Sequence, residues 1–250
     1  MVARRPFPML PGRAANLVRG RFGMALRNSD PAVYYRLFAP RRFEGPSGLQ
    51  DSPRAFALRV RDLEGLMLIP GQRYEIGFNL FDIINPPFEN IRDALCAGVL
   101  AECTGIEGLD LLRLNLDPPP GEVSRIRVRF LSPTELKPSG GPEFGALFAR
   151  IRDRVSNLRA LYGEGPLHID FRAMGERAKK IRMPLCEVRE YAAERISRNT
   201  GLRHGLGGIV GVAEYEGDLA EFVPYLEAAR WSGVGRYTVW GNGEIDWEVI

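Results

Sequence analysis

The chain has 250 residues, of which 45% are hydrophobic and 26% are charged, with a formal net charge of +3. This length and composition are typical of a globular protein with one large domain or two smaller ones. No apolar run reaches the ~18–20 residues of a membrane span, and the basic residues 1–12 are not followed by a signal-peptide pattern, so we expect neither membrane insertion nor secretion.

The first half predicts two helices and several short strands. Residues 13–28 place apolar side chains on one face at helical spacing, and residues 29–53, rich in Pro, Gly, Ser and Arg, favour an irregular loop. Strands are expected over 56–60 and 74–81, then a helix over 86–102 and a strand over 109–116. The Pro-Pro-Pro-Gly run at 118–121 breaks the chain, so the predicted domains are residues 1–121 and 122–250.

The second half repeats this plan. Strands are expected over 125–130, 186–196, 209–215 and 237–247, with helices over 143–161 and 219–229, which is the βαββαβ order of a ferredoxin-like domain. The first half gives αββαβ, with its opening strand missing or reduced to residues 7–10. Residues 163–182 are interpreted as a basic helical insertion in the second domain. The predicted fold class is α+β, with two tandem ferredoxin-like domains.

The last 46 residues carry the densest glycine pattern. Gly207, Gly208 and Gly211 lie among β-branched residues, and Gly233-Val234-Gly235-Arg236 stands between a helix and the last strand. Such glycines allow close backbone approach, and their N–H groups can hold an anion such as phosphate. The third glycine and the strand-then-helix context of a dinucleotide fingerprint are missing, which argues against a Rossmann site. Contacts to a phosphate backbone are therefore predicted at Gly233, Gly235 and Arg236.

The cations are almost all arginine, 31 against 3 lysines, which reflects either coding bias or the value of arginine for binding phosphates and bases. Arg125, Arg127 and Arg129 alternate with apolar residues, so a strand would carry all three on one face, spaced by ~6.6 Å. That face is either a solvated outer surface or a path for a single-stranded backbone. Further candidate nucleic-acid contacts lie on predicted helices: Arg150, Arg154, Lys179 and Lys180.

Several other classes of site are not expected. The chain has no GxxxxGK[ST], HExxH, paired CxxC or GxSxG motif, and its carboxylates lack the DxD-like pairs of a two-metal nuclease. Cys96, Cys103 and Cys186 lack metal-ligand spacing, so we expect free thiols that act as small core hydrophobes in a reducing, cytoplasmic compartment. No metal site and no cofactor are predicted.

Three segments resemble the CRISPR-associated precursor-crRNA endoribonucleases of the RAMP superfamily. The closing segment is similar to the family's G-G-x-V-G strand, G-D-L helix start and glycine-rich loop, at residues 207–211, 216–219 and 233–243. Leu10-Pro11-Gly12 with residues 17–23 is similar to the family's P-G-x-x-[LI]-R-G-x-[FL]-G opening. Residues 195–208 resemble its arginine-rich approach to the glycine strand. Together the motifs touch about a third of the chain.

The resemblance implies two tandem ferredoxin-like domains of the RRM and RAMP type, in agreement with the element order. It also implies an endoribonuclease that needs no metal, cuts CRISPR precursor RNA at the base of the repeat stem-loop and leaves a 2′,3′-cyclic phosphate. The implied partners are CRISPR repeat RNA, crRNA and other CRISPR effector subunits. Two alternatives stay open: a non-catalytic RAMP subunit that holds crRNA in a ribonucleoprotein complex, and a ferredoxin-like protein unrelated to RNA.

Metal-independent RNA cleavage needs a base for the 2′-OH, an acid for the leaving 5′-oxygen and cations for the phosphorane. Of the two histidines, His168 is interpreted as structural or solvent-exposed, and His204, directly before the glycine strand, as a candidate acid or base. In many relatives the catalytic histidine lies on or just after the first helix, where this chain has arginines and tyrosines. Candidate catalytic residues are therefore Arg21, Tyr35, Arg36 and His204, with further RNA contacts predicted at Arg19, Arg198 and Arg203.

Overall fold

The computed structural model describes residues 1–40, 52–98, 101–102, 110–136, 141–192, 194–196, 203–205 and 207–250. The chain divides into two compact units. The first comprises residues 1–112, 161–164 and 239–241, and the second comprises residues 113–160, 165–238 and 242–250. The predicted domain limits at residues 121 and 122 stay a prediction.

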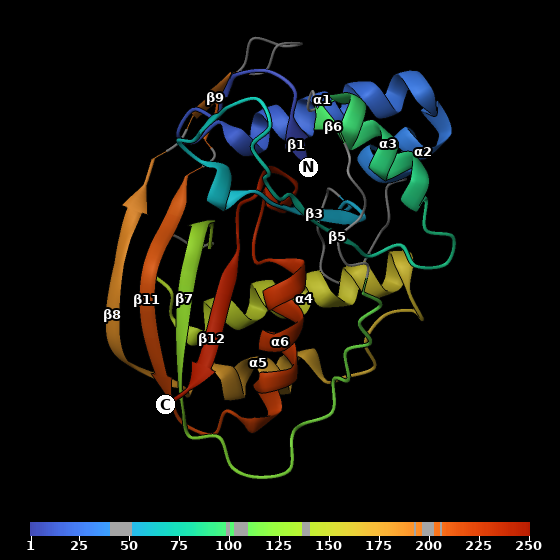
Figure 1. Cartoon of the computed structure of the whole chain (residues 1–250). Coiled ribbons are helices and arrows are strands. Elements are labelled where there is room, and N and C mark those ends of the chain that lie inside the picture. The colour runs from blue at the N-terminus through green and yellow to red at the C-terminus, as the bar shows by residue number, and fades with distance from the viewer. Residues whose placement is uncertain are drawn as a thin grey trace. The chain divides into compact units, whose positions relative to one another are not determined.

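The second unit is built on a four-stranded antiparallel sheet with the order β12–β7–β11–β8 (Figure 1). Its strands are β7 (Arg125–Thr134), β8 (Arg182–Tyr191), β11 (Gly208–Glu216) and β12 (Ile245–Val249). Helix α4 (Phe144–Tyr162) follows β7, and the short helix η2 (Ala220–Phe222) with α6 (Val223–Ser232) follows β11. This is the βαββαβ order that the sequence predicts for this half, with the strand order of a ferredoxin-like domain.

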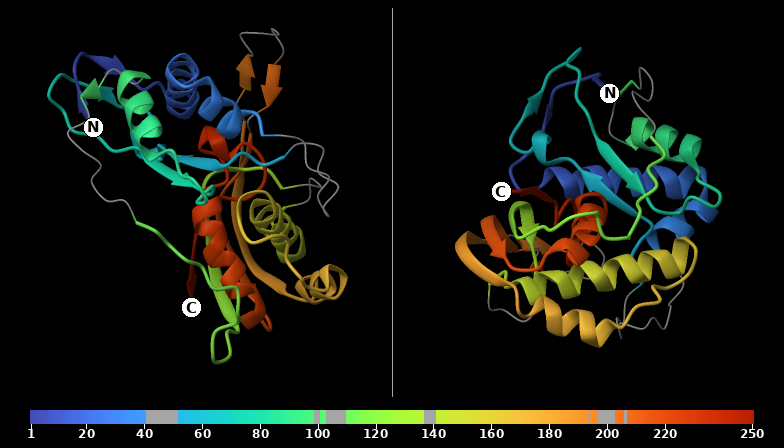
Figure 2. Two further views of the ribbon diagram at one scale, coloured as in Figure 1. Left: turned by 90° about the vertical axis from the view of Figure 1, so that its right-hand side faces the viewer. Right: turned by 90° about the horizontal axis from the view of Figure 1, so that it is seen from below.

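Two additions interrupt this plan between β7 and β11. Helix α5 (Phe171–Ala178), drawn in yellow-orange in Figure 2, is predicted from the sequence as part of an insertion. It begins after Asp170, whose Oδ1 accepts a hydrogen bond from the Ala173 N–H at 2.9 Å. A short hairpin of β9 (Glu194–Ile196) and β10 (Arg203–Gly205) extends the chain between β8 and β11. The predicted strand over 186–196 is therefore two strands, β8 and β9.

Strand β7 shows why one face of this sheet is polar and the other apolar. Ile126, Val128 and Phe130 are buried in the core, and the alternating arginines lie on the opposite face. Helices α4 and α6 pack on the apolar side through stacked and edge-on aromatic rings of Phe144, Phe148, Tyr215, Phe222 and Tyr225. The arginine-bearing face is thereby left to solvent.

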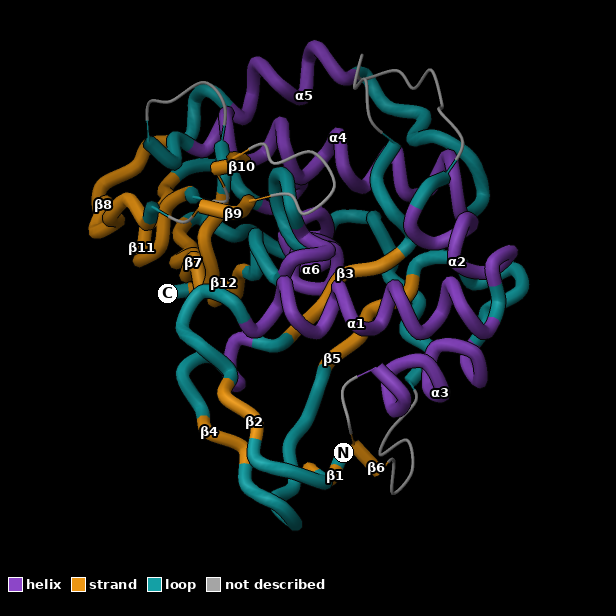
Figure 3. Tube along the Cα trace, turned by 90° about the horizontal axis from the view of Figure 1, so that it is seen from above, coloured by secondary structure: helices purple, strands orange, loops and turns teal. Residues whose placement is uncertain are grey.

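The first unit contains helices α1 (Ala14–Ser29), α2 (Pro31–Phe38) and α3 (Phe88–Gly98), with α1 alongside α3 (Figure 3). Its described strands form three separate antiparallel pairs. They are β1 (Val2–Ala3) with β6 (Ala101–Glu102), β2 (Phe7–Pro8) with β4 (Met67–Leu68), and β3 (Phe56–Arg59) with β5 (Gly77–Leu80). A short helix, η1 (Arg61–Leu63), follows β3.

The strands of these pairs are short. β1 pairs with β6, β2 pairs with β4, and β3 pairs with β5, each in antiparallel fashion. The predicted opening strand is thus present as β1 and β2. Phe22, Phe38, Phe56 and Phe78 form the aromatic core of this unit.

Helix α2 corrects the prediction of an irregular loop over 29–53, of which residues 41–51 lie outside the described part. Asp30 caps the helix, because its Oδ1 accepts from the Val33 N–H at 3.0 Å, and Pro31 occupies the first turn. An N-cap aspartate before a proline is a helix-start signal. The Pro, Gly and Ser residues further along favour a loop and mask this signal.

Two strand predictions are also wrong. Residues 110–116 form no strand, and β6 occupies that place in the pairing. The last strand begins at Ile245 instead of 237, because residues 238–240 form a short helix, η3 (Thr238–Trp240), and Gly241 and Gly243 have positive φ.

The cysteines depart from the sequence prediction at two positions. Cys96 is disulfide-bonded, and Cys186 is a free thiol that lies exposed rather than in the core. Cys103 lies outside the described residues. Within the described ranges, no helix combines the length and the apolar character needed to cross a membrane.

Candidate functional site

The glycine-rich loop of the second unit follows α6 directly, and its glycines are required by the backbone. Gly233 and Gly235 have φ of 75° and 72°, in the region that favours glycine. A Cβ at Gly235 would lie 2.4 Å from the carbonyl oxygen of Glu135. Tyr237 has φ of 66°, the one positive value among the described residues other than glycine. The tip of this loop, residues 233–237, therefore holds a conformation that few sequences can adopt.

Hydrogen bonds fix the base of the loop and leave its tip open. The Val234 N–H donates to the Gly243 carbonyl at 2.8 Å, and the Gly243 N–H donates to the Pro133 carbonyl at 2.9 Å. Within the described part of the chain, no group accepts from the N–H of Gly235 or Arg236. The Arg236 side chain is 54% exposed and lies 3.9 Å from a Glu135 carboxylate oxygen. Two adjacent backbone donors and one cation are thus available at the tip, as the predicted phosphate contact requires.

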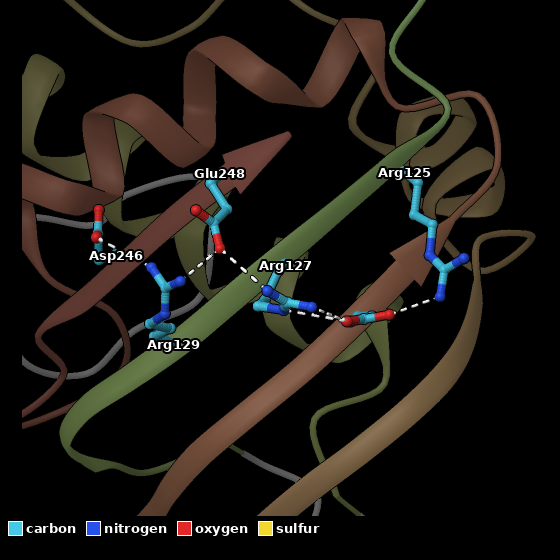
Figure 4. Close-up of polar contacts among 6 residues, drawn as sticks. Arg125, Arg127, Arg129, Asp246 and Glu248 are labelled. Atoms are coloured by element: carbon cyan, nitrogen blue, oxygen red, sulfur yellow. Dashed lines mark hydrogen bonds and ion pairs between the residues drawn. The ribbon is translucent and has the colours of Figure 1, made fainter. Parts of the chain in front are cut away.

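Arg125, Arg127 and Arg129 lie side by side on β7, as the sequence predicts, but carboxylates occupy their guanidinium groups (Figure 4). Glu214 on β11 bonds Arg125 at 2.6 Å and Arg127 at 2.7 Å. On the other side, β12 contributes the carboxylates of Asp246 and Glu248 to Arg127 and Arg129. The two arginines lower the pKa of the Glu214 carboxyl, Arg127 most strongly. We call these six residues the sheet-face network.

The sheet-face network carries no net charge, because three guanidinium groups face three carboxylates. Of the two interpretations open from the sequence, this geometry favours a solvated outer surface over a backbone path. An RNA phosphate at Arg127 would have to displace a carboxylate that already bonds it. The predicted RNA contacts at these three positions therefore need a direct test.

The two candidate cations on helix α4 differ in burial. Arg154 is buried, with 8% of its surface exposed, and donates to the Ser232 carbonyl at 2.8 Å and to Thr238 Oγ1 at 2.7 Å. This burial argues against the predicted RNA contact at Arg154, which stays a prediction, because Nε and Nη2 both donate to groups inside the protein. Arg150 is half-buried and stays a candidate. Lys179 and Lys180 at the end of α5 are exposed, and Lys179 bonds Glu176 at 2.8 Å.

The candidates of the first unit lie on α1 and α2. The Arg36 guanidinium donates to Asp82 Oδ2 at 2.6 Å and to the Asn85 carbonyl, and still has 33% of its side chain exposed. Arg36 and Asn85 line a shallow pocket of about 390 Å³ together with residues 86–90. This arginine is thus held in a fixed direction at the surface of the unit.

The other first-unit candidates are two arginines beside aromatic rings and one exposed tyrosine. The Arg21 guanidinium lies 4.6 Å from the Phe7 ring, and Arg19 lies 4.1 Å from the Trp240 ring, both at cation–π distance. Tyr35 is 54% exposed. A cation on an aromatic face keeps donors for a further partner, so Arg21 stays available to an anion.

The structure describes the side chain of His168 but not that of His204. His168 is exposed, as predicted. His204 lies on β10 with Arg195 as its backbone partner on β9, and the side chains of Arg203 and His204 are outside the described part, as is the whole of Arg198. Among the described residues, no group of three or more His, Cys, Asp or Glu side chains is arranged to hold a metal ion.

Comparisons with known proteins identify one family model and several solved structures that this chain resembles. Residues 128–245 match the sequence model of a family described as CRISPR-associated endoribonuclease Cas6. A Thermus thermophilus Cas6 (TTHB231) in a product complex is similar in structure, with a TM-score of 0.59, 17% identity, and coverage of 99% of this chain and 97% of that chain. A Cas6 (TTHA0078) product complex gives a TM-score of 0.55 and 18% identity, over 99% and 97% of the two chains.

A further similar structure is entitled partial Cas6-RT-Cas1–Cas2 complex. Its TM-score is 0.53 at 14% identity, and the match covers 100% of this chain but 44% of that one. A search of curated protein sequences gave no match. At these identities the structural likeness establishes the mixed α+β fold, and the match of residues 128–245 concerns the segment that runs from β7 to the start of β12.

Proposed function

We propose that the chain is a Cas6-type CRISPR-associated endoribonuclease, the family whose model matches residues 128–245, and that it cuts CRISPR precursor RNA at the base of the repeat stem-loop to give mature crRNA. The observation that carries this proposal is the family match over the ferredoxin-like sheet and the glycine-rich loop. The strand pairings support a ferredoxin-like domain in the first unit as well.

The proposed reaction needs no metal. The 2′-OH of the nucleotide before the cut attacks the adjacent phosphorus, the 5′-oxygen of the next nucleotide leaves with a proton, and a 2′,3′-cyclic phosphate remains. The residues that hold the RNA would include the tip of the glycine-rich loop, where the N–H groups of Gly235 and Arg236 have no acceptor among the described residues. Two adjacent N–H groups and a guanidinium suit a non-bridging phosphate oxygen.

Arg36 is the described candidate best suited to stabilise the phosphorane. Asp82 and the Asn85 carbonyl fix its guanidinium, so the cation would need little reorganisation when negative charge develops on the phosphate. Arg21 is a second candidate cation, and Tyr35 and His204 are candidate proton donors or acceptors. Neither α1 nor α2 contains a histidine, so an imidazole acid would have to come from elsewhere in the chain.

That absence favours a second candidate function, a non-catalytic RAMP subunit that holds crRNA within a ribonucleoprotein complex. The structure entitled partial Cas6-RT-Cas1–Cas2 complex supports other Cas proteins as partners under either function. The two functions differ in one observable, because only the endoribonuclease converts a repeat RNA into two defined fragments. Mixing the protein with candidate Cas subunits and following its elution by size-exclusion chromatography tests the partners.

The deciding experiment incubates the purified protein with end-labelled repeat RNA in EDTA. We expect one cut, a 2′,3′-cyclic phosphate on the upstream fragment, and complete loss of cleavage when the nucleotide before the cut carries a 2′-deoxy sugar, because the nucleophile is then missing. Binding without cleavage would favour the non-catalytic subunit. Cleavage of the 2′-deoxy RNA, or a requirement for Mg²⁺, would contradict the proposed chemistry.

A further inference from the structure

The glycine-rich loop stands at an electrostatically unfavourable place for binding a phosphate. Its first residue, Gly233, is the C-cap of α6, and its N–H donates to the Ala229 carbonyl at 2.8 Å. The C-terminal end of a helix carries unpaired carbonyl oxygens and about half a negative charge, which repels an anion. Phosphate-binding loops usually lie at helix N-termini, where both effects have the opposite sign. A loop in this position needs a compensating cation.

Arg154 on α4 supplies that cation at the end of α6. Its Nε donates to the carbonyl oxygen of Ser232, the last residue of α6, at 2.8 Å. The Arg154 side chain is buried, so a low local dielectric strengthens this charged hydrogen bond. A cation at the last turn opposes the helix dipole. The negative end of α6 is therefore covered where the loop begins.

The same guanidinium holds the other end of the loop. One terminal nitrogen donates to Thr238 Oγ1 at 2.7 Å, and Thr238 is 3% exposed. A Cβ at Gly233 would lie 2.9 Å from Thr238 Cγ2, so the two ends of the loop are packed against each other. Arg154 thus bonds the residue before the tip and the residue after it. The five residues between them contain the positive φ values of Gly233, Gly235 and Tyr237.

We infer that Arg154 is a positioning residue that clamps the glycine-rich loop in its phosphate-binding conformation and neutralises the α6 C-terminus beneath it. The inference rests on the proposed function for the identity of the ligand, an RNA phosphate. Arg154 does not touch the RNA itself. Lysine can replace the charge but has one nitrogen, so it cannot bond Ser232 and Thr238 in the same two-armed geometry.

The experiment compares Arg154→Met and Arg154→Lys with Arg152→Met as the matched control. Arg152 lies on the same helix but bonds the Phe171 carbonyl at 2.8 Å and Asp153, away from the loop. Amide hydrogen exchange of residues 233–237 is measured in the protein without RNA. Binding of a repeat RNA with a 2′-deoxy sugar at the cut is measured across a salt series. Thermal unfolding of each variant shows whether it folds.

We expect Arg154→Met to speed exchange at residues 233–237 at least tenfold and to weaken RNA binding by ~10–100-fold, the usual range for a charged hydrogen bond. The salt slope of log K should fall by ~0.7 for each phosphate that the variant no longer binds, which a merely less stable protein would not show. Arg154→Lys should fall between wild type and Arg154→Met, and Arg152→Met should match wild type. Arg154→Lys keeps the test decisive if Arg154→Met does not fold.

If amide hydrogen exchange of residues 233–237 is unchanged in both Arg154 variants, the inference that Arg154 clamps the loop is wrong. Faster exchange with unchanged RNA affinity and salt slope would overturn the link between the clamp and phosphate binding. A wild-type protein that binds no repeat RNA would overturn the proposed function and the assignment of RNA as the ligand, while the exchange data would still decide whether Arg154 clamps the loop.

Discussion

The sheet-face network and the glycine-rich loop of the second unit both present arginine to solvent, and they differ in what the arginines bond. On the sheet-face network, Arg125, Arg127 and Arg129 share three carboxylates, so the arginines are visible in the sequence but chemically occupied. At the glycine-rich loop, the Arg236 guanidinium is 54% exposed and lies 3.9 Å from a Glu135 carboxylate oxygen, and no described group accepts from the N–H of Gly235 or Arg236. The glycine-rich loop has fewer arginines than the sheet-face network, but more of its donors lack a close acceptor and can bond an anion.

This difference shows that the number of cations on a surface does not determine how well that surface binds phosphate. A phosphate gains from donors that have no competing acceptor, and it gains little where it must displace a carboxylate of similar strength. The first unit offers an intermediate case. Arg36 bonds one carboxylate and one carbonyl, so it is oriented without being surrounded by acids. The largest effect is nevertheless expected at Arg36, because it is proposed to stabilise the transition state, and the expected effects then decrease from the loop to the sheet-face network.

The largest effect is expected at Arg36, on cleavage rather than on binding. Arg36→Gln should lower the single-turnover rate constant by ~10²–10³, the usual cost of removing one preorganised donor to a developing oxyanion. Arg61→Gln is the control, because Arg61 is an exposed arginine of the same unit that bonds its neighbour Asp62. If His204 is instead the acid or base, His204→Ala lowers the rate by ~10²–10⁴ and Arg36→Gln costs under tenfold.

Gly235→Val should weaken binding of repeat RNA by well over tenfold. Valine would need a positive φ and would place its Cβ against the Glu135 carbonyl oxygen, so the tip must change shape. Gly121→Val is the control for backbone strain, because Gly121 has φ of 114° but a Cβ added there would meet no atom within 4 Å. A Gly235→Val protein that folds and binds RNA like wild type would reduce the loop to a tight turn.

The sequence predicted the second unit well because its signals are periodic. Alternation along β7 and the apolar faces of α4 and α6 gave the element order, and the observed order of four strands agrees with it. The first unit was harder to predict, since its strands are two to four residues long and leave almost no period to detect. Helix α2 was missed although Asp30 and Pro31 signal its start.

Site residues were predictable by type and position, but not by partner. The alternation of Arg125, Arg127 and Arg129 predicted their common face, whereas their carboxylate partners on β11 and β12 lie 87–121 residues away in the sequence. The residues around Arg154 in the sequence indicate an ordinary exposed cation on a helix. They do not show that the loop after α6 covers this face of α4. Pairing and burial of this kind come from tertiary contacts that periodicity does not encode.

Neutral replacement within the sheet-face network should change RNA affinity by less than threefold. The double variant Arg127→Gln with Glu214→Gln removes one cation and one carboxylate, so the net charge of the face stays the same. Arg236→Ala, in comparison, should weaken binding at every RNA sequence and lower the salt slope by ~0.7 for the one phosphate that it no longer binds. A loss of affinity above tenfold in the double variant would show that the network itself follows the RNA backbone.

The smallest effect concerns the acid stability of the second unit. Arg127 and Arg125 lower the pKa of Glu214 in the folded protein, so the folded state favours the carboxylate more than the unfolded state does. That contribution is fully present above the unfolded pKa of about 4.3 and is lost as the pH falls through the lower folded value. Glu214→Gln should therefore flatten the fall of unfolding free energy below about pH 4.3, and replacement of the exposed Glu122 by Gln should not. Urea unfolding at a series of pH values measures both slopes. Identical slopes for Glu214→Gln and wild type would mean that the ion pairs on this face are too well solvated to couple to folding, and the contrast between the network and the loop would then rest on the loop alone.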